Sequence, residues 1–345
     1  MGVPLHQALS LGWYLFKQKI KRNKRYPLNL MLEPLFRCNL ACPGCGKIQY
    51  PEEDLKKHLS VEQCLQAATE CGAPMVTIPG GEPLIHPQIE QIIEGLLKQK
   101  RYVIMCTNAL LLERNLHKLT PNPRFTISVH MDGYQEHHDH CVDRPGVYDI
   151  AVSAIKAALA KGFRVITNTT VFEGHSIKNL TQLFDHMMEL GVEGLTISPG
   201  YSYEKAPDQN HFFKQQRTHE FFKELFEYQR AHNKNWEFND SPFFLDFLEG
   251  KRDYECTPWG MPTYNIFGWQ KPCYLLTNEG YATTYQELMQ TTEFERYGTA
   301  SKNPKCANCM THCGYEPTAV TDAMSGIGKM IEMGRGTLTR GRAVG

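Results

Sequence analysis

The stretch LNLMLEPLFRCNLACPGCGK, Leu28–Lys47, joins an apolar, strand-like run to a loop that carries three cysteines. Cys38, Cys42 and Cys45 follow the spacing C-x3-C-x2-C, and no fourth cysteine lies nearby. A closed zinc or iron–sulfur site usually takes four protein ligands, whereas three thiolates can hold three irons of a four-iron cube and leave the fourth iron open. The spacing therefore suggests an open cluster; the alternatives are a zinc site completed by a distant residue and three thiols that bind no metal.

The composition limits the class of protein around this loop. The chain has 345 residues, 41% of them apolar, and its 37 basic residues balance 37 acidic ones. That length allows one large domain and a smaller one, and the balanced charge argues against nucleic-acid binding. No apolar run reaches the roughly 20 residues of a membrane span, and the N-terminus lacks the order of a signal peptide. We therefore expect a cytoplasmic protein, in which twelve cysteines indicate metal ligation rather than disulfides.

Strand-like and helix-like segments alternate after residue 27. Six apolar runs predict strands across residues 27–200, and amphipathic segments between most of them predict helices. One helix is expected to begin at the capping-box pattern Ser60-Val61-Glu62-Gln63. Such alternation implies parallel strands with right-handed helical crossovers, so the predicted fold class is α/β, a barrel or part of one.

Three regions follow from these patterns. Residues 1–26 contain a predicted amphipathic helix, residues 27–231 the α/β barrel, and residues 232–345 a cysteine-rich C-terminal domain. The apolar residues of the helix recur at three- and four-residue steps: Leu5, Leu9, Trp13, Phe16 and Ile20. Six lysines and arginines crowd its end. This pattern fits a helix packed on the domain, or one that contacts a membrane surface.

Polar residues share one face of two predicted strands. In TISVHMD, Ser128 lies on the same face as His130 and Asp132, and in VITNTT, Asn168 lies on the same face as Thr170. A small closed barrel normally fills its centre with apolar side chains. A polar interior therefore predicts a cavity that holds a polar ligand, with Ser128 and Asn168 as candidate contacts.

Two glycines and an acid end the predicted second strand, in GGEP at Gly80–Pro83. Glycine lets a backbone approach a ligand closely, which predicts such an approach at Gly80 and Gly81. Glu82 can pair with an ammonium group or, alternatively, cap the helix that follows.

Together these motifs resemble the radical S-adenosylmethionine (radical SAM) superfamily. The cysteine loop and GGEP are joined by CTNA at Cys106–Ala109 and HMDG at His130–Gly133. The resemblance implies a partial (β/α)6 TIM-type barrel in which one-electron cleavage of S-adenosylmethionine gives methionine and a 5′-deoxyadenosyl radical. The implied ligands of the [4Fe-4S] cluster are Cys38, Cys42 and Cys45, and the implied contacts of S-adenosylmethionine are Gly80, Gly81, Glu82, Asn108, Ser128 and Asn168. Gly44 departs from the pattern, because the superfamily usually has an aromatic residue there near the adenine, so the stacking side chain must come from elsewhere.

A wider resemblance runs through almost the whole chain. CNLACPGCGKIQYP, TIPGGEPLIHP, MCTNALLL, HMDGYQEHHD and ISPGYSYEKAPDQNHF are similar to the adenosylhopane synthase (adenosyl-hopene transferase) family of hopanoid biosynthesis. The implied reaction adds the radical to the alkene of diploptene, a hopene, and then donates a hydrogen atom to the resulting tertiary radical. A thiol suits that donation, and Cys106, which shares strand parity with Asn108, is the expected catalytic residue. The expected partners are a reductant such as flavodoxin or ferredoxin and the inner face of the membrane.

Five cysteines in the C-terminal region form a second candidate metal site. CANCMTHC contains Cys306, Cys309 and Cys313, and Cys256 and Cys273 lie upstream. Four of the five are enough for an auxiliary iron–sulfur cluster or a zinc ion, and a site without metal is the alternative. An auxiliary cluster also fits a radical SAM maturase that modifies peptides, which is the main enzymatic alternative. A zinc-stapled protein that docks on lipid is the non-enzymatic one.

Overall fold

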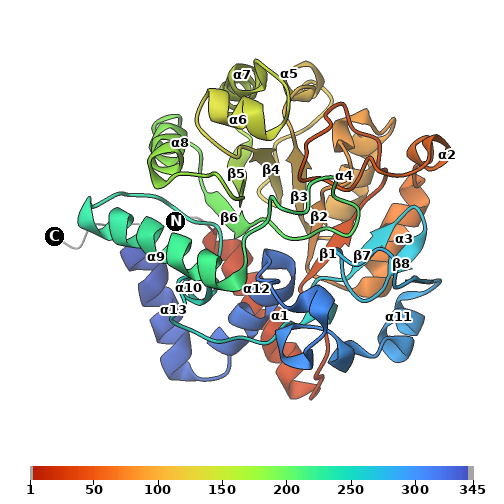
Figure 1. Ribbon diagram of the computed structural model, residues 1–345. Helices are drawn as coiled ribbons and strands as arrows, with labels where there is room; N and C mark the ends of the chain where they lie inside the picture. Colours follow the sequence, from red (N-terminus) through yellow and green to blue (C-terminus); the bar gives the residue numbers. More distant parts are fainter. Residues whose placement is uncertain (1–2, 341–345) are drawn as a thin grey trace.

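The computed structural model describes residues 3–340, and its centre is a nine-stranded sheet in the order β6-β5-β4-β3-β2-β1-β7-β8-β9. The first six strands are parallel and lie side by side in chain order. They are β1 Asn29–Leu32, β2 Met75–Ile78, β3 Tyr102–Thr107, β4 Phe125–His130, β5 Arg164–Val171 and β6 Leu195–Pro199. This is the predicted α/β partial barrel, which is confirmed, and Figure 1 shows its strands inside an arc of helices.

The outer helices connect these strands as right-handed crossovers require. They are α2 Glu52–Leu55, α3 Val61–Cys71, α4 Ile89–Lys98, α5 Leu112–Asn115, α6 Glu136–Cys141, α7 Val147–Ala160 and α8 Ile177–Glu189. Helix α3 begins at the predicted capping box, where Ser60 Oγ accepts from Gln63 N and the Gln63 side chain accepts from Ser60 N. Gly72 ends it in the left-handed conformation, which glycine adopts without strain.

The C-terminal region extends the same sheet. Strand β7 Thr263–Asn265 pairs in parallel with β1, and β8 Gly268–Gln270 and β9 Tyr281–Ala282 follow as antiparallel neighbours. The remaining helices are α9 Gln215–Ala231, α10 Pro242–Leu248, α11 Tyr285–Thr291, α12 His312–Ala323 and α13 Ile327–Arg340. Short 3-10 turns lie at η1 Pro83–Ile85, η2 Pro258–Gly260, η3 Phe294–Arg296, η4 Thr299–Ser301 and η5 Pro304–Cys306. The boundary near residue 232 stays a prediction.

Strand β4 shows how the two faces of the sheet position the site. Ile127 and Val129 are fully buried within the main hydrophobic core, which the outer helices complete. Thr126 and Ser128 point to the opposite face and are also almost fully buried. Polar side chains therefore line the inside of the partial barrel, as the sequence predicts.

The N-terminal helix, α1 Leu5–Ile20, forms as predicted, but its apolar stripe faces outward. Its buried residues are Gln7 and Leu15, and neither belongs to the stripe of leucine, aromatic and isoleucine side chains. None of the helices in residues 3–340 is both long and apolar enough to cross a bilayer.

Candidate active site

A cleft of about 1010 Å³, including its open mouth, lies at the carboxyl ends of the parallel strands. Ligand sites of α/β sheets occur at this edge, where loops follow the strands. Most of the predicted site residues meet here: Cys38, Cys42, Cys45, Gly80, Gly81, Cys106, Asn108 and Asn168 line it. Glu82 and Ser128 lie behind its wall.

The cysteine loop after β1 places three thiols in this cleft. Cys38 and Cys42 pack against a small apolar cluster around Leu40 and Val142, and Asn108 Nδ2 lies 3.6 Å from Cys38 Sγ. Burial raises the pKa of Cys38 to about 11 and also raises the pKa of Cys42 and Cys45. The thiols are therefore protonated until a metal centre replaces their protons.

The spacing of these sulfur atoms tests which metal centre fits. Thiolates on one zinc ion lie roughly 3.8 Å apart, given a Zn–S distance of about 2.3 Å and tetrahedral angles. In the described part of the chain, the three sulfur atoms do not all lie within 4.8 Å of one another. The three thiols are thus not gathered as closely as one zinc ion needs, which is compatible with a four-iron cube, where each thiolate is held by a separate iron.

The GGEP loop after β2 touches the start of the cysteine loop directly. Gly81 N donates to Leu35 O at 2.9 Å, and Glu82 N donates to Arg37 O at 3.0 Å. A Cβ on Gly81 would lie 2.2 Å from the Arg37 carbonyl oxygen. Glycine is therefore required here for two backbones to approach each other, and the approach fixes the position of the residues just before Cys38.

Glu82 spans the ends of β2 and β3 rather than pointing into the cleft. Its carboxylate accepts from Leu84 N at 3.0 Å, from Thr107 Oγ1 at 2.9 Å and from Asn108 N at 2.9 Å. Its side chain is fully buried, and burial raises its pKa to about 7. These contacts match the capping alternative, because Glu82 is the N-cap of η1. The contact with an ammonium group stays a prediction.

Cys106 projects from the end of β3 into the cleft, one residue before Thr107. Its neighbour across the sheet is Ser128 of β4, which lies behind it. Burial raises the pKa of the Cys106 thiol to about 12, despite the hydrogen bond with Ser128 that lowers it. At neutral pH this side chain therefore keeps its S–H bond.

A buried ion pair beside the cysteine loop is a feature that the sequence patterns do not predict. Lys47 Nζ lies 2.7 Å from Glu33 Oε1, and the two side chains are 3% and 0% exposed. The ammonium also lies over the rings of Tyr274 and Tyr203, 4.3 and 5.0 Å from their centroids. Burial raises the pKa of Glu33 although Lys47 opposes the change. The pair ties the end of β1 to the residues just after Cys45.

A second ion pair lines the cleft on β4. His130 Nε2 lies 2.7 Å from Asp132 Oδ2, and Asp132 Oδ1 accepts from Thr170 N at 2.8 Å. Burial lowers the pKa of His130, but the nearby carboxylate outweighs it and raises the pKa. For Asp132, burial alone would raise the pKa, but the nearby His130 has the larger effect, and the net result is a lowered pKa. Asn168 and Thr170 of β5 line the same wall, as strand parity predicts.

Phe172 supplies an aromatic ring beside the departure at Gly44. A Cβ on Gly44 would lie 3.0 Å from two ring atoms of Phe172, which follows β5 and lines the cleft. Phe172 also stacks on His211, with ring centroids 4.3 Å apart. The ring occupies the space beside the cysteine loop that a larger residue at position 44 would need. The loop after β5 therefore brings an aromatic ring to the side of Gly44.

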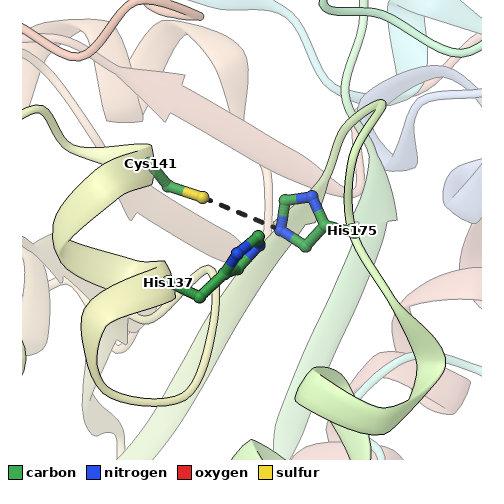
Figure 2. Close-up of side chains that lie close together, drawn as sticks. All are labelled: His137, Cys141 and His175. Atoms are coloured by element: carbon green, nitrogen blue, oxygen red, sulfur yellow. Dashed lines mark hydrogen bonds between the residues drawn. The ribbon is translucent and has the colours of Figure 1, made fainter.

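Figure 2 shows a group of three potential ligands that the sequence patterns did not single out: His137, Cys141 and His175. Their ligand atoms all lie within 4.8 Å of one another. However, His175 Nε2 lies 2.7 Å from Asp132 O, and its Nδ1 lies 3.1 Å from Phe172 N, so both ring nitrogens are already engaged with backbone. His175 thus ties the loop after β5 to Asp132, and Cys141 is a second thiol of the cleft wall outside the cysteine loop.

The rear cysteines gather in a second pocket of about 610 Å³, a volume that includes its open mouth. Cys256, Cys273, Cys306 and Cys309 line it, and Thr311 Oγ1 lies 3.3 Å from the sulfur atoms of both Cys309 and Cys313. The five rear cysteines, which span 57 positions of the sequence from Cys256 to Cys313, are thus brought together. Tyr201 lines both this pocket and the active-site cleft.

Comparisons with known proteins agree with this geometry. Residues 32–187 match the family described as "Radical SAM superfamily", and residues 195–333 match one described as "Domain of unknown function (DUF3463)". GTP 3′,8-cyclase 1 of Mycobacterium tuberculosis is 26% identical over 183 residues, which cover 50% of this chain and 51% of the relative. The antilisterial bacteriocin subtilosin biosynthesis protein AlbA of Bacillus subtilis is 26% identical over 263 residues, which cover 73% of this chain and 56% of AlbA. The chain thus spans about half the length of the curated relatives it matches.

Solved structures share the fold at low sequence identity. SuiB of Streptococcus suis bound to S-adenosylmethionine has a TM-score of 0.59 at 15% identity, with 72% of this chain and 60% of that one covered. The protein anSMEcpe with bound AdoMet and the Cp18Cys peptide has a TM-score of 0.54 at 15% identity, with 90% of this chain and 99% of that one covered.

The partial barrel thus carries a three-thiol loop and a cleft at the carboxyl edge of its sheet. The match over residues 32–187, a little under half of the chain, and the curated relatives support a radical SAM enzyme. Its cofactors are accordingly a [4Fe-4S] cluster and S-adenosylmethionine.

Proposed function

We propose that this enzyme adds a 5′-deoxyadenosyl group to the alkene of diploptene and completes the product, adenosylhopane, with a hydrogen atom from Cys106. When bound, the cluster and S-adenosylmethionine supply the 5′-deoxyadenosyl radical. Cys38, Cys42 and Cys45 are the proposed cluster ligands, and Gly80, Gly81, Asn108 and Asn168 are the proposed cofactor contacts that line the cleft. Ser128 and Glu82 act from behind the wall by positioning Cys106 and the end of β3.

The observation that carries this proposal is a protonated thiol in the wall of the cleft. Addition of a radical to an alkene leaves a carbon one hydrogen atom short of the saturated product. Cys106 faces the cleft, and its raised pKa keeps the S–H bond that such a donation breaks. The thiyl radical then left on Cys106 regains the thiol by taking up one electron and one proton. A reductant such as flavodoxin or ferredoxin therefore serves both this step and cofactor cleavage.

The walls of the cleft suit a hydrocarbon next to a polar cofactor. Tyr201, Tyr203, Phe212 and Phe172 belong to an apolar cluster that borders the cleft. The polar groups lie instead on the inner strand faces, at His130, Asn168 and their neighbours. A site divided in this way offers one part to a nucleoside and another to an apolar substrate.

A peptide-modifying maturase is the second candidate, and the comparisons favour it more than they favour a hopanoid enzyme. AlbA is named for bacteriocin biosynthesis, and the similar solved structures include SuiB with its precursor peptide SuiA and anSMEcpe with the Cp18Cys or the Kp18Cys peptide. These relatives are 26% identical or less, so they support a peptide substrate for this chain only as a proposal.

We infer further that the rear pocket binds an auxiliary iron–sulfur cluster rather than zinc. Within residues 3–340, no three of its sulfur atoms lie within 4.8 Å of one another, which is wider than a single zinc ion requires. Cys256, Cys273, Cys306 and Cys309 line the pocket, and Cys313 is a fifth thiol within reach through Thr311. Either proposed reaction is compatible with this second centre.

Anaerobic incubation with diploptene, S-adenosylmethionine and dithionite tests the proposal. Mass spectrometry is expected to find the saturated nucleoside–triterpene adduct with the wild-type protein. Cys106→Ala is expected to cleave the cofactor but to lose at least 90% of this product, whereas Cys141→Ala, which removes the other thiol of the cleft outside the cysteine loop, keeps it. Cofactor cleavage without any adduct overturns the hopanoid proposal and leaves the peptide candidate; equal product from Cys106→Ala and wild type overturns the role of Cys106.

A further inference from the structure

Helix α1 is attached to the domain by the face opposite its apolar stripe. Tyr102 OH donates to His6 O at 3.0 Å, and Tyr14 OH donates to Pro27 O at 2.7 Å. Gln7 and Leu15 are the buried residues of the helix. An amphipathic helix normally buries its apolar face against the core. Here that arrangement is reversed.

The stripe itself is exposed along the whole helix. Leu5, Leu9, Trp13, Phe16 and Ile20 expose 64%, 65%, 57%, 48% and 65% of their surfaces. Their spacing at four, four, three and four residues keeps them on one side of a helix about 24 Å long. Exposed apolar side chains that occur singly need no explanation, but a contiguous row of five large ones indicates a surface that another body covers.

The charge of the same segment limits which kind of partner can cover the stripe. No acidic residue occurs before Glu33, whereas five exposed cations end or follow the helix: Lys17, Lys19, Lys21, Arg22 and Lys24. A sixth cation, Arg25, is paired with Glu295. Lys17 Nζ lies over the Trp13 ring, 5.0 Å from its centroid, at the border between the apolar and basic surfaces. Because the whole chain is neutral, this end is a local concentration of positive charge. A second copy of the segment would bring like charges together, whereas an anionic surface complements them.

We propose that α1 lies in the headgroup layer of an anionic phospholipid bilayer, with the five stripe residues directed into the acyl boundary. A helix of 16 residues is too short to span a bilayer but suits this parallel position. Trp13 and Phe16 stack, with ring centroids 5.7 Å apart, and tryptophan favours the interface between water and acyl chains. The cations add attraction to anionic headgroups within a Debye length of the surface. This inference does not rest on the proposed substrate.

Sedimentation of the full-length chain with liposomes tests the docking. Vesicles of phosphatidylcholine with 30% phosphatidylglycerol are expected to bind wild-type protein at least tenfold more tightly than vesicles of phosphatidylcholine alone, and added salt is expected to remove most of that difference. The double variant Trp13→Ser/Phe16→Ser is expected to bind at least tenfold more weakly. Ile150→Ser is the matched control, because Ile150 is 42% exposed on α7, away from the stripe, and it is expected to bind like wild type.

Three results overturn the docking proposal. The first is equal vesicle binding by the wild type and the double variant, and the second is no binding of the wild type to anionic vesicles. The third is a dimer of the wild type in gel filtration that is absent from the double variant, because this would assign the stripe to a second copy of the chain. Thermal unfolding measured by circular dichroism checks that the substituted, exposed positions leave the fold intact. An adduct formed from detergent-solubilised diploptene by the double variant separates failure of docking from failure of the proposed reaction.

Discussion

The contact between the GGEP loop and the cysteine loop predicts a large effect of Gly81→Ala. A Cβ at this position would lie 2.2 Å from the Arg37 carbonyl oxygen and 2.3 Å from the Phe36 carbonyl oxygen, more than 1 Å short of ordinary contact. Both atoms belong to backbone, so no side-chain rotation relieves the clash. The segment just before Cys38 must therefore retreat by about 1 Å, at a cost of about 1–3 kcal/mol.

A displacement of about 1 Å in a catalytic loop can reduce a rate roughly 100-fold. We expect reconstituted Gly81→Ala to lose most of its iron and sulfide and to form 5′-deoxyadenosine at least about 100-fold more slowly. Gly72→Ala is the control, because a Cβ there meets nothing within 4 Å and the strain comes from its positive φ of 70° alone. That variant is expected to lose about 1–2 kcal/mol of stability and no iron. Full iron content and a normal rate in Gly81→Ala would refute the reasoning.

Three further predictions concern charges and metal. Glu33→Gln leaves Lys47 buried without its partner and is expected to lower the free energy of unfolding of the metal-free protein by about 3–5 kcal/mol in urea titrations, and Lys47→Met in the same chain to recover most of the loss. His130→Gln is expected to be most destabilising between about pH 4 and 6.5. The lowered pKa of Asp132 stabilises the fold above the pKa of an unfolded carboxyl group, and the raised pKa of His130 stabilises it below the pKa of an unfolded histidine. The loss of stability should shrink as pH rises through the raised pKa of His130, and a loss that is constant with pH would contradict this reasoning. Reconstituted wild type is expected to hold about eight irons per chain, and the double variant Cys306→Ser/Cys309→Ser, which keeps three of the five rear thiols, about four; four irons in both would remove the auxiliary cluster.

Much of the fold follows from local patterns in the sequence. The alternation of strands and helices predicts the parallel sheet, and the capping box at Ser60 marks the start of α3. Strand parity places Asn168 and Thr170 on the wall of the cleft. These features depend on residues that are near in sequence, where a period of two or a four-residue cap determines the geometry.

The rest of the site depends on pairings between distant segments. Phe172 fills the space beside Gly44 because the loops after β1 and β5 meet at the same edge, which no local pattern states. The Lys47–Glu33 pair and the direction of Glu82 toward Asn108 are likewise tertiary choices. For α1, helical periodicity identifies an apolar face but not its partner, so only the structure reveals that the face is exposed.

Mössbauer spectroscopy of protein reconstituted anaerobically with iron-57 tests the central claim most directly. The claim is that Cys38, Cys42 and Cys45 hold three corners of a four-iron cube whose remaining iron is free to bind the cofactor. We predict that S-adenosylmethionine shifts the signal of about one iron per cube in wild-type protein, and that Cys42→Ser, which lacks one ligand, shows no such shift. A spectrum unchanged by S-adenosylmethionine, or a shift that survives in Cys42→Ser, would contradict the account.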